Sequence, residues 1–326
     1  MSEKLLDIID LNTYFTIEDK TIYAVNGVSF DIRKKEVVAL IGESGSGKSV
    51  TALSVMGLIP QPPGKIKSGK IMFEGKDLLK MTEKELRHIR GNQISMVYQE
   101  PMNSLNPRLT IGYQLKECLT IHKIVSGKEA RDRAIELLKK VEIPEPEQRY
   151  NAYPHELSGG MRQRVMIAMA LMCNPKLLIA DEPTTALDVT IQAEVLDLIK
   201  RLKDEYETSV LLITHDLGVV TEMADRIVVM YAGKIREIAS ARELYFNPQH
   251  PYTVGLMKCI PRMNEVKSKL YTIEGSVPDL SSEADGCEFY PRCDKRLGIC
   301  EKNRPELIKI SDNHSVRCWR HSEVVK

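Results

Sequence analysis

The run VVALIGESGSGKS at residues 37–49 decides how this chain folds. Its first part, VVALI at 37–41, is apolar and mostly β-branched, which predicts a short buried strand. The following GESGSGKS at 42–49 fits the pattern G-x-x-x-x-G-K-S/T, and the residues after it can form a helix. Strand, glycine-rich loop and helix in this order are the context in which the pattern binds phosphate groups. The sequence therefore predicts a phosphate-binding loop at the carboxyl end of a buried strand.

Each residue type in this loop suits the binding of phosphate groups. Glycines let successive backbone N–H groups turn toward the phosphates, where a Cβ atom would obstruct them. The positive end of the following helix points at the same groups. We expect Lys48 to reach the β- and γ-phosphates of a nucleotide and the Ser49 hydroxyl to bind Mg²⁺. The residues predicted to bind the nucleotide are Gly42, Ser44, Gly45, Ser46, Gly47, Lys48 and Ser49.

Two further apolar runs end in side chains that suit ATP hydrolysis. LLIADEP at 177–183 predicts a strand ending in Asp181, at the sheet edge where open α/β folds bind nucleotides. We expect Asp181 to help hold Mg²⁺, directly or through water, and Glu182 to polarise the attacking water as a general base. SVLLITHD at 209–216 predicts another strand, after which His215 would contact the γ-phosphate and orient the water. Each residue alone also fits a solvated or structural position, but beside the phosphate loop they predict a hydrolytic site.

The composition is that of a globular protein and excludes several other classes. Among 326 residues, 46 Lys and Arg nearly balance 45 Asp and Glu, which argues against a nucleic-acid-wrapping protein. No apolar run approaches the ~20 residues that span a bilayer. The start MSEKLLDIIDLNTYF lacks the basic end and long apolar stretch of a signal peptide. We therefore expect a cytosolic protein or one attached to the cytosolic face of a membrane.

The order of the apolar patterns predicts the domain organisation. At roughly 150 residues per domain, the length predicts two domains. Strands alternate with helices, which predicts an α/β fold with a largely parallel sheet covered on both faces. A helical stretch at about 100–173 is predicted to be inserted into that sheet domain. We expect the sheet domain to cover 1–245 and a smaller, loop-rich extension to cover 246–326.

Four of the seven cysteines lie close together near the end of the chain, at Cys287, Cys293, Cys300 and Cys318. Without a secretion signal, such a cluster indicates metal binding sooner than disulfides. Four thiolates can bind a tetrahedral Zn²⁺ or an iron–sulfur cluster. The intervals are wider than the C-x2-C pairs of most zinc fingers, which slightly disfavours zinc and leaves both open. The remaining cysteines, Cys118, Cys173 and Cys259, are expected to act as small buried hydrophobes.

In their order and spacing from roughly residue 5 to 240, these motifs resemble the ATPase subunits of ABC transporters. LSGGM at 157–161 resembles the signature motif of that family, and it lies between the phosphate loop and the strand of Asp181, as in that family. Met161 stands where the family usually has Gln, and its side chain cannot donate a hydrogen bond. The resemblance implies that the γ-phosphate is bound by the hydroxyl and backbone amides of Ser158, Gly159 and Gly160.

The resemblance also assigns the remaining motif positions. Gln99 in VYQEP resembles the glutamine that senses Mg²⁺ and the transmembrane partner, and Thr185–Asp188 resembles the D-loop, with Asp188 at the nucleotide. His215 resembles the switch histidine. The position of the adenine-stacking aromatic falls near Phe15, with Tyr14 and Tyr23 as nearby alternatives.

The fold and the partners follow from the same resemblance. It implies a P-loop NTPase (RecA-like) core with an inserted α-helical subdomain, an N-terminal antiparallel β-subdomain and a small Cys-rich C-terminal extension. In this family the signature of one subunit completes the nucleotide site of its partner. Because the chain has one phosphate loop, a second ABC ATPase chain is required, in a heterodimer or a homodimer. The resemblance further implies two transmembrane permeases, an extracellular or periplasmic solute-binding protein, no nucleic acid, and a peripheral place on the cytoplasmic face of the cell membrane.

Two segments of the extension narrow the family branch. HPYTVGL at 250–256 and GCEFYPRC at 286–293 resemble the C-terminal extension of oligopeptide and dipeptide importer ATPases, a branch shared with nickel importers. In that branch the cysteines are associated with a [4Fe-4S] cluster, which implies that each of the four clustered cysteines binds one iron, with Zn²⁺ as the alternative. The resemblance thus implies ATP hydrolysis coupled to peptide import. Import of nickel or another solute, a soluble ABC-type ATPase acting on nucleic acid, and a redox sensor are the other hypotheses.

Overall fold

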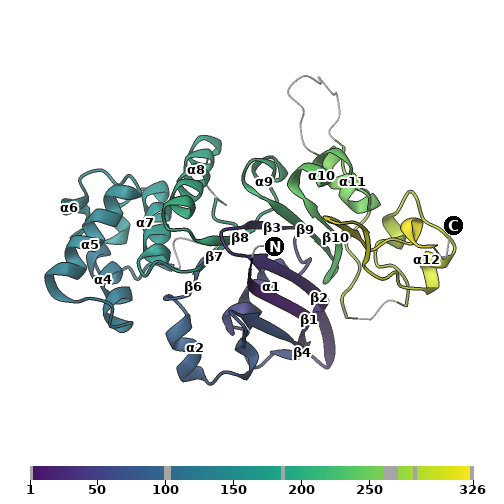
Figure 1. Cartoon of the computed structure of the whole chain (residues 1–326), viewed down its shortest axis with the longest axis horizontal. Helices are drawn as coiled ribbons and strands as arrows, with labels where there is room; N and C mark the ends of the chain where they lie inside the picture. The colour runs from purple at the N-terminus through teal and green to yellow at the C-terminus, as the bar shows by residue number, and fades with distance from the viewer. Residues whose placement is uncertain (1–2, 99–103, 185–187, 260–270, 282–284, 324–326) are drawn as a thin grey trace. The chain divides into compact units, whose positions relative to one another are not determined.

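The computed structural model describes residues 3–98, 104–184, 188–259, 271–281 and 285–323 (Figure 1). The chain forms two compact units, each assembled from separate stretches of sequence. The helical unit comprises Met1–Glu3, Arg33–Glu36 and Lys80–Ile213, and the phosphate-loop unit comprises Lys4–Ile32, Val37–Leu79 and Thr214–Lys326. The C-terminal extension therefore belongs to the same unit as the phosphate loop, while the division into 1–245 and 246–326 remains a prediction.

An antiparallel sheet is formed by the first strands of the phosphate-loop unit, in the order β2-β1-β4-β5 (purple to blue in Figure 1). Its strands are β1 (Lys4–Ile17), β2 (Lys20–Arg33), β4 (Gly64–Phe73) and β5 (Lys76–Asp77), and the short helix η1 (Leu78–Lys80) follows. Glu18 and Asp19 join β1 to β2, both at positive φ, as in the two-residue turns whose twist suits a hairpin. β1 and β4 pair antiparallel, with Leu6 opposite Phe73. The predicted N-terminal antiparallel subdomain is confirmed.

A second sheet holds the phosphate loop and, within this unit, has the strand order β11-β12-β10-β9-β3. The strands are β3 (Val37–Ile41), β9 (Arg226–Tyr231), β10 (Lys234–Ser240), β11 (Ile308–Ser311) and β12 (His314–Val316). β3 and β9 are parallel, with Ile41 beside Val229, and the other neighbours are antiparallel. The extension therefore adds β12 and β11 to the edge of this sheet, although its sequence predicts mainly loops.

The helices of this unit pack the extension against the sheet. They are α1 (Lys48–Met56), α9 (Leu217–Met223), α10 (Ala241–Phe246) and α11 (Pro251–Lys258), with η3 (Tyr290–Arg292), α12 (Ile299–Lys302) and η4 (Trp319–His321) in the extension. α11 begins at the HPY sequence, where Nδ1 of His250 accepts a hydrogen bond from the Tyr252 N–H and Pro251 takes the first helical position. One hydrophobic core includes Ile41, Val229, Tyr231, Tyr252 and Phe289. The extension thus shares its core with the strands beside the phosphate loop.

The strands of the helical unit are parallel, in the order β6-β7-β8. They are β6 (Ile94–Val97), β7 (Leu177–Asp181) and β8 (Ser209–Ile213). Every residue of β7 and β8 is buried, as expected for parallel strands covered on both faces. The predicted alternation of parallel strands and helices is confirmed.

Helices make up most of the remaining helical unit (blue to teal in Figure 1). They are α2 (Glu83–Ile89), α4 (Ile111–Ile121), α5 (Gly127–Lys140), α6 (Pro146–Arg149), η2 (Pro154–Glu156), α7 (Gly159–Leu171) and α8 (Val189–Glu205). The buried members of the predicted apolar stripes are Ala134, Ile135, Leu138 and Val141 in and after α5 and Val195, Leu198 and Leu202 on α8. Ile191, which begins the predicted α8 stripe, is half-buried. The helical insertion is therefore built on amphipathic helices, as its sequence predicts.

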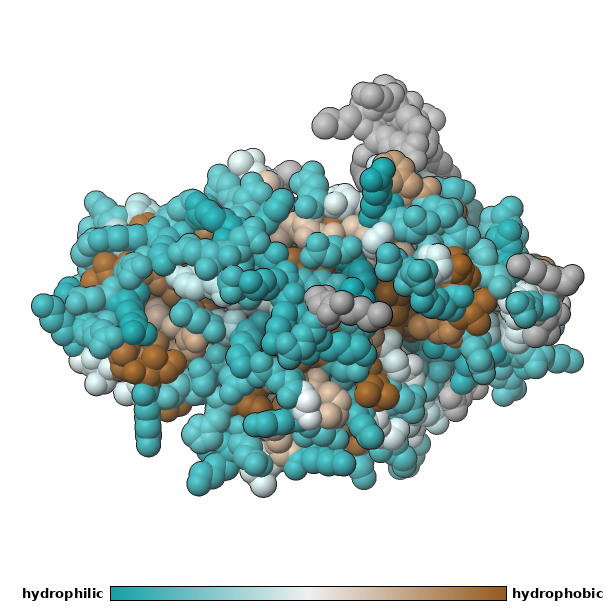
Figure 2. Space-filling model, in the orientation of Figure 1, coloured by the Kyte–Doolittle hydropathy of each residue, from teal (hydrophilic) through white to brown (hydrophobic). Residues whose placement is uncertain are grey.

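The described helices are all too short or too polar to cross a bilayer. The face drawn in Figure 2 is largely hydrophilic, with separate hydrophobic patches.

Candidate nucleotide site

The phosphate loop lies between β3 and α1, in the predicted strand–loop–helix order. Its glycines are required by backbone geometry, because Gly42, Gly45 and Gly47 have φ values of 154°, 76° and 101°. A Cβ atom on Gly42 would lie 2.2 Å from the carbonyl oxygen of Met230, and one on Gly47 would lie 2.3 Å from that of Ala24. Substitution at either position would therefore displace the backbone of the loop or its neighbours.

The polar groups of the loop are arranged for an anion. Lys48 is buried, and its Nζ donates hydrogen bonds to the carbonyl oxygens of Gly42 at 2.8 Å and Glu43 at 3.0 Å. No described side chain caps the N-terminus of α1, which begins at Lys48 with Gly47 as its N-cap. The buried hydroxyl of Ser46 has no hydrogen-bond partner among the described residues. An ammonium group, an uncapped helix N-terminus and an orphaned hydroxyl together suit phosphate oxygens.

The other predicted loop residues are more accessible. Ser44 and Gly45 are exposed and Ser49 is half-buried at the start of α1. His215, in the same unit, lies exposed before α9 and after the buried Thr214. An exposed imidazole at this point can turn toward a bound nucleotide.

The predicted adenine-stacking aromatics lie on the antiparallel sheet of the phosphate-loop unit. Phe15 is half-buried on β1, opposite Gly64 of β4. Tyr14 instead packs on Tyr23 of β2, with ring centroids 4.6 Å apart in an edge-to-face arrangement. Phe15 is thus not engaged in the tyrosine pair, but its contact with adenine remains a prediction.

Asp181 and Glu182 lie at the carboxyl end of β7 in the helical unit. Asp181 is the last residue of the strand and is buried. Glu182 leaves the strand with a φ of 46°, and its N–H donates to the carbonyl of Ile213 on β8 at 2.8 Å. The backbone bond fixes the point from which the Glu182 carboxylate projects.

Two glutamines hold the chain that follows Glu182, a role that sequence reasoning missed. The buried Gln163 of α7 donates from Nε2 to the carbonyl of Pro183, and Gln192 of α8 donates to that of Thr184 at 3.2 Å. Their signal in the sequence is weak, since a glutamine on a helix is commonly a surface residue.

The signature residues form the exposed N-terminus of α7. The Ser158 hydroxyl caps the helix by accepting a hydrogen bond from the Met161 N–H at 3.3 Å. Ser158 and Gly159 are exposed, and a Cβ atom on Gly159 would meet no described heavy atom within 4 Å. Met161 thus contributes its backbone to the cap, which needs no hydrogen bond from its side chain. The open end of the helix is accessible to a ligand.

The structure places the predicted residues in their two units, each described by itself. The phosphate loop, Phe15 and His215 lie in the phosphate-loop unit. Asp181, Glu182 and the signature lie in the helical unit, as does Asp188, the exposed N-cap of α8. Gln99 and the D-loop positions 185–187 lie outside the described residues. The assembly of these groups into one ATP site remains a prediction.

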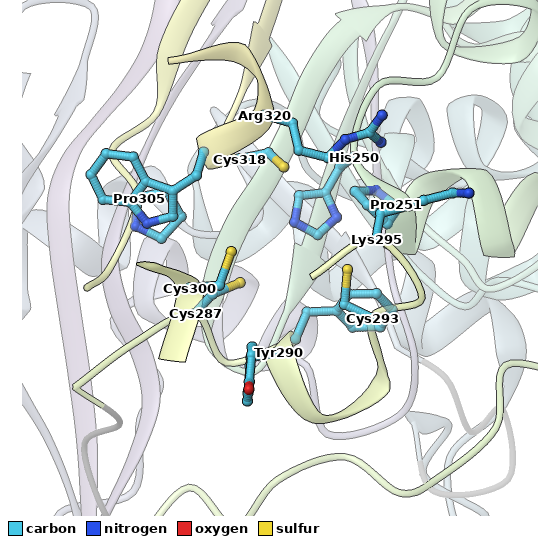
Figure 3. A pocket seen from close by; sticks show the side chains of 12 residues that line it. His250, Pro251, Cys287, Tyr290, Cys293, Lys295, Cys300, Pro305, Cys318 and Arg320 are labelled. Atoms are coloured by element: carbon cyan, nitrogen blue, oxygen red, sulfur yellow. The ribbon is translucent and has the colours of Figure 1, made fainter. Parts of the chain in front are cut away.

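A separate site is formed by the clustered cysteines of the extension. Cys287, Cys293, Cys300 and Cys318 line one pocket together with His250 and aromatic side chains (Figure 3). Cys300 is buried and the other three are half-buried, and these described thiols form no disulfide. Burial raises the pKa of Cys293 to about 11. No group of three or more described His, Cys, Asp or Glu side chains has the arrangement expected around a metal ion.

Buried charges lie beside the cysteine pocket. Arg236 is fully buried, and its Nη2 donates to Glu288 Oε2 at 2.6 Å. Burial by itself would raise the pKa of Glu288, but the guanidinium of Arg236 brings that pKa below its ordinary value. The Nε and Nη1 atoms of Arg236 have no hydrogen-bond partner among the described residues. The guanidinium that carries these unpartnered nitrogens acts electrostatically on the Cys287 thiol, so it favours a negatively charged group there.

The three scattered cysteines show no sign of a reactive site. Burial raises the pKa of Cys118 to about 11 and that of Cys173 to about 12. Burial also raises the pKa of Cys259. Since the thiolate is the nucleophile, raised pKa values make these thiols unreactive. They are half-buried and act as small apolar groups with weak hydrogen bonds to backbone carbonyls.

Comparison with known proteins agrees with this geometry. The family model for ABC transporters matches residues 25–185, and that for the oligopeptide/dipeptide transporter C-terminal region matches residues 236–300. The oligopeptide transport ATP-binding protein AppD of Bacillus subtilis is 55% identical, over 98% of this chain and 97% of its own length. This chain belongs to the ABC transporter family. It is an ABC-type ATPase of the oligopeptide/dipeptide branch and hydrolyses ATP, as its motifs predict.

A second relative and a solved structure support the same assignment. The dipeptide transport ATP-binding protein DppD of Bacillus subtilis is 51% identical to this ABC ATPase, over 97% of this chain and 95% of its own. A dimeric ATP-binding cassette, solved in a post-hydrolysis state with ADP and phosphate, has a TM-score of 0.65 and 31% identity. That similarity covers 73% of this chain and 99% of the solved chain. The predicted ABC ATPase fold is confirmed.

Proposed function

We propose that this ABC ATPase drives the import of peptides across the cytoplasmic membrane. The observation that carries the proposal is similarity along almost the whole chain, C-terminal region included, to proteins named for oligopeptide and dipeptide transport. The similarity of residues 236–300 matters most, because that region is named for this branch of transporters. The solute passes through partner subunits, so the ATPase supplies energy and not the binding site for the peptide.

Uptake by proteoliposomes tests this function. The ATPase would be reconstituted with the two permeases that co-purify with it, and radiolabelled dipeptide, hexapeptide or nickel would be offered with the solute-binding protein. ATP on the ATPase side is expected to support peptide uptake, and Glu182→Gln is expected to abolish it. Nickel uptake without peptide uptake would assign the transporter to the nickel alternative.

The residues of each unit suit a hydrolytic mechanism. The loop amides and Lys48 would hold the β- and γ-phosphates, while Ser49, Gln99 and Asp181 would hold Mg²⁺, which supplies neutralising charge to the phosphate oxygens. Glu182 would accept a proton from the attacking water at its carboxylate, and His215 would orient that water. The close packing around Gly42 and Gly47 and the unpartnered Ser46 hydroxyl support the binding of phosphate by the loop.

We further propose that the complete site forms between two ATPase chains. The exposed N-terminus of α7 presents the Ser158 hydroxyl and backbone N–H groups, which suit a γ-phosphate held by a second chain. The partner is a second ABC ATPase, in a heterodimer or a homodimer, and the pair works beneath two permeases on the cytoplasmic face of the membrane. Purification from detergent-solubilised membranes is expected to recover these permeases. Tight recovery with nucleic acid instead would overturn the proposal.

For the cysteine pocket we propose a [4Fe-4S] cluster. The four thiols line one pocket, and the orphaned N–H groups of Arg236 suit an anionic cluster better than a neutral one. The intervals between the cysteines are wider than the C-x2-C pairs of most zinc fingers, which also favours the cluster over zinc. Anaerobic purification is expected to yield iron and sulfide in equal amounts. Stoichiometric zinc without sulfide would overturn this assignment.

A further inference from the structure

The second residue of the phosphate loop, Glu43, is held by two residues from the distant C-terminal extension. Its backbone N–H donates to the Tyr252 hydroxyl at 2.8 Å. Its carboxylate accepts two hydrogen bonds from Arg292, from Nη1 to Oε2 at 2.8 Å and from Nη2 to Oε1 at 3.2 Å. All three residues belong to the phosphate-loop unit. The extension thus contacts the loop through both the backbone and the side chain of one residue.

Arg292 is held rigidly on its other sides. Its Nε donates to the carbonyl of Glu274 at 3.0 Å and its Nη2 to that of Ile273 at 3.1 Å. Its Nη1 also donates to the Tyr231 hydroxyl at 3.3 Å, and the side chain is only 6% exposed. Because Arg292 is itself fixed and binds the carboxylate through two nitrogens with little solvent between them, it fixes the position of the Glu43 side chain.

Tyr252 is an equally rigid support. It is fully buried, and its ring packs against those of Tyr231 and Phe289 at centroid distances of 4.7 and 5.4 Å. Burial raises the pKa of its hydroxyl, which therefore stays protonated. A fixed hydroxyl oxygen meets the Glu43 N–H from within the hydrophobic core.

Glu43 in turn holds the groups predicted to meet the nucleotide. Its carbonyl oxygen accepts a hydrogen bond from Lys48 Nζ at 3.0 Å and another from the Ser46 N–H at 3.1 Å. A displacement of Glu43 would therefore move the ammonium group and the turn of the loop together. The path from the extension to the lysine has two steps, each made of hydrogen bonds.

We propose that Arg292 and Tyr252 are positioning residues for the phosphate loop. Through Glu43 they preorganise the loop for ATP, so that the affinity for ATP depends on the C-terminal extension. The competing explanation is purely structural: the contacts would attach the extension to the core, and their loss would lower stability and leave the loop unaffected.

Variants of the full chain separate these explanations. Arg292→Met removes the ion pair, and Tyr252→Phe removes one hydroxyl and keeps the packing of the ring. Each is expected to weaken ATP binding about tenfold, the usual weight of a hydrogen bond to a charged group or a buried donor. Titration calorimetry with MgATP measures the affinity. The kcat at saturating ATP is expected to change less than about twofold, because the loop is mispositioned in the free enzyme and recovered in the complex.

The matched control is Arg296→Met in the same extension. Arg296 is exposed, and its guanidinium lies over the ring of Tyr290, 5.5 Å from the ring centroid. It is expected to leave ATP affinity unchanged. Equal loss in this control would mean general damage to the extension and would overturn the proposal.

A double-mutant cycle between Arg292→Met and Glu43→Gln gives the sharper test. If Arg292 acts through Glu43, the double variant is expected to bind ATP no more weakly than either single variant. Losses that multiply, or wild-type affinity with a lowered melting temperature in Arg292→Met, would establish the structural explanation. Should Arg292→Met fail to fold, Arg292→Lys, which keeps the charge but loses the two-pronged geometry, and Tyr252→Phe provide the same test.

Discussion

Glu182 is the residue whose chemical role can be tested most directly. Its N–H is bonded to β8, so substitution of the carboxylate leaves its position at the strand end unchanged. Glu182→Gln keeps the size and polarity of the side chain but removes the base. We expect ATP hydrolysis to fall by at least about a hundredfold, with ATP affinity retained. Steady-state hydrolysis and calorimetric titration of the same preparation measure both quantities.

A control for this variant is Glu129→Gln, which changes an exposed glutamate paired with Arg133 on α5. Hydrolysis by this control is expected to match that of the wild type. Normal turnover in Glu182→Gln would remove Glu182 from the role of general base.

Gly47 tests whether the loop needs glycine for its shape. At a φ of 101°, and with a Cβ atom placed 2.3 Å from the Ala24 carbonyl, Gly47→Ala would strain the backbone and also clash. Gly75 is the matched control, because it has a φ of 78° but no described heavy atom within 4 Å of its Cβ position. We expect Gly75→Ala to cost about 1 kcal/mol of stability and leave ATP binding intact. Gly47→Ala is expected to abolish detectable ATP binding, and equal behaviour of the two variants would contradict the close packing of the loop.

The site residues that can be predicted from the sequence lie in local patterns. The residues that only the structure reveals contact partners far away in the sequence. Lys48, Asp181 and Glu182 are predicted from local patterns, in which a buried strand leads directly into the proposed site. Arg292 meets Glu43 across 249 residues, and no periodicity or spacing indicates such a pair. The same holds for the buried pair of Arg236 and Glu288. Long-range partners of charged residues depend on the packed fold.

At the level of elements, the apolar sequence patterns predict the long helices and buried strands but not the short strands of the extension. The long amphipathic helices α5 and α8 and the buried strands β7 and β8 have strong periodic or continuous apolar signals. β12 has only His314–Val316, too short for any periodicity, and pairs with β10 through tertiary packing. Its neighbour β11 is mostly exposed, so its sequence has no apolar run that would predict a strand. Short edge strands are therefore found from the fold and not from the sequence.

The hairpin of β9 and β10 makes a prediction about pH and stability. Lys234 begins β10, is buried, and donates from Nζ to the Asn26 carbonyl at 3.2 Å. Burial, opposed by Glu288 and reinforced by nearby arginines, lowers the pKa of Lys234 from 10.5 to about 8. Between these values the unfolded chain holds a proton that the folded chain has lost, so stability rises with pH through this window. Below about pH 8 the charged, buried Lys234 lowers the stability of the fold by its full amount, and this loss of stability decreases as the pH approaches 10.5.

Lys234→Met is therefore expected to change stability in a pH-dependent way. We compare the free energy of unfolding of the variant with that of the wild type at two pH values. The variant-minus-wild-type difference is expected to be about 2 kcal/mol larger near pH 7 than near pH 10. Urea denaturation of both proteins across this range measures the difference. The exposed Lys76→Met on β5 is the control and is expected to show a constant difference. A Lys234→Met difference that is equally constant would mean that Lys234 stays charged in the folded protein.

On the scale of the whole molecule, one short segment, residues 289–293, contacts both the cysteine pocket and the residues that hold the phosphate loop. Cys293 lines the pocket, and the preceding residue, Arg292, holds Glu43. Phe289 links the same segment to Tyr252 through ring packing. A change in the ligation of Cys293 would therefore reach both supports of the loop. If this segment couples the proposed cluster to the loop, each site must change the affinity of the other by the same factor.

This coupling predicts that loss of the proposed cluster weakens ATP binding. Removal of iron from anaerobically purified protein by mild oxidation and chelation is expected to lower ATP affinity several-fold, and bound ATP is expected to slow the loss of the cluster absorbance. In Arg292→Met the same treatment should leave ATP affinity unchanged, because the connection is already broken. An equal decrease in both proteins would show that the cluster acts on the fold in general and not through Arg292. Purified protein without iron would refute the cluster alone, since the effect of Arg292→Met on ATP binding requires no metal.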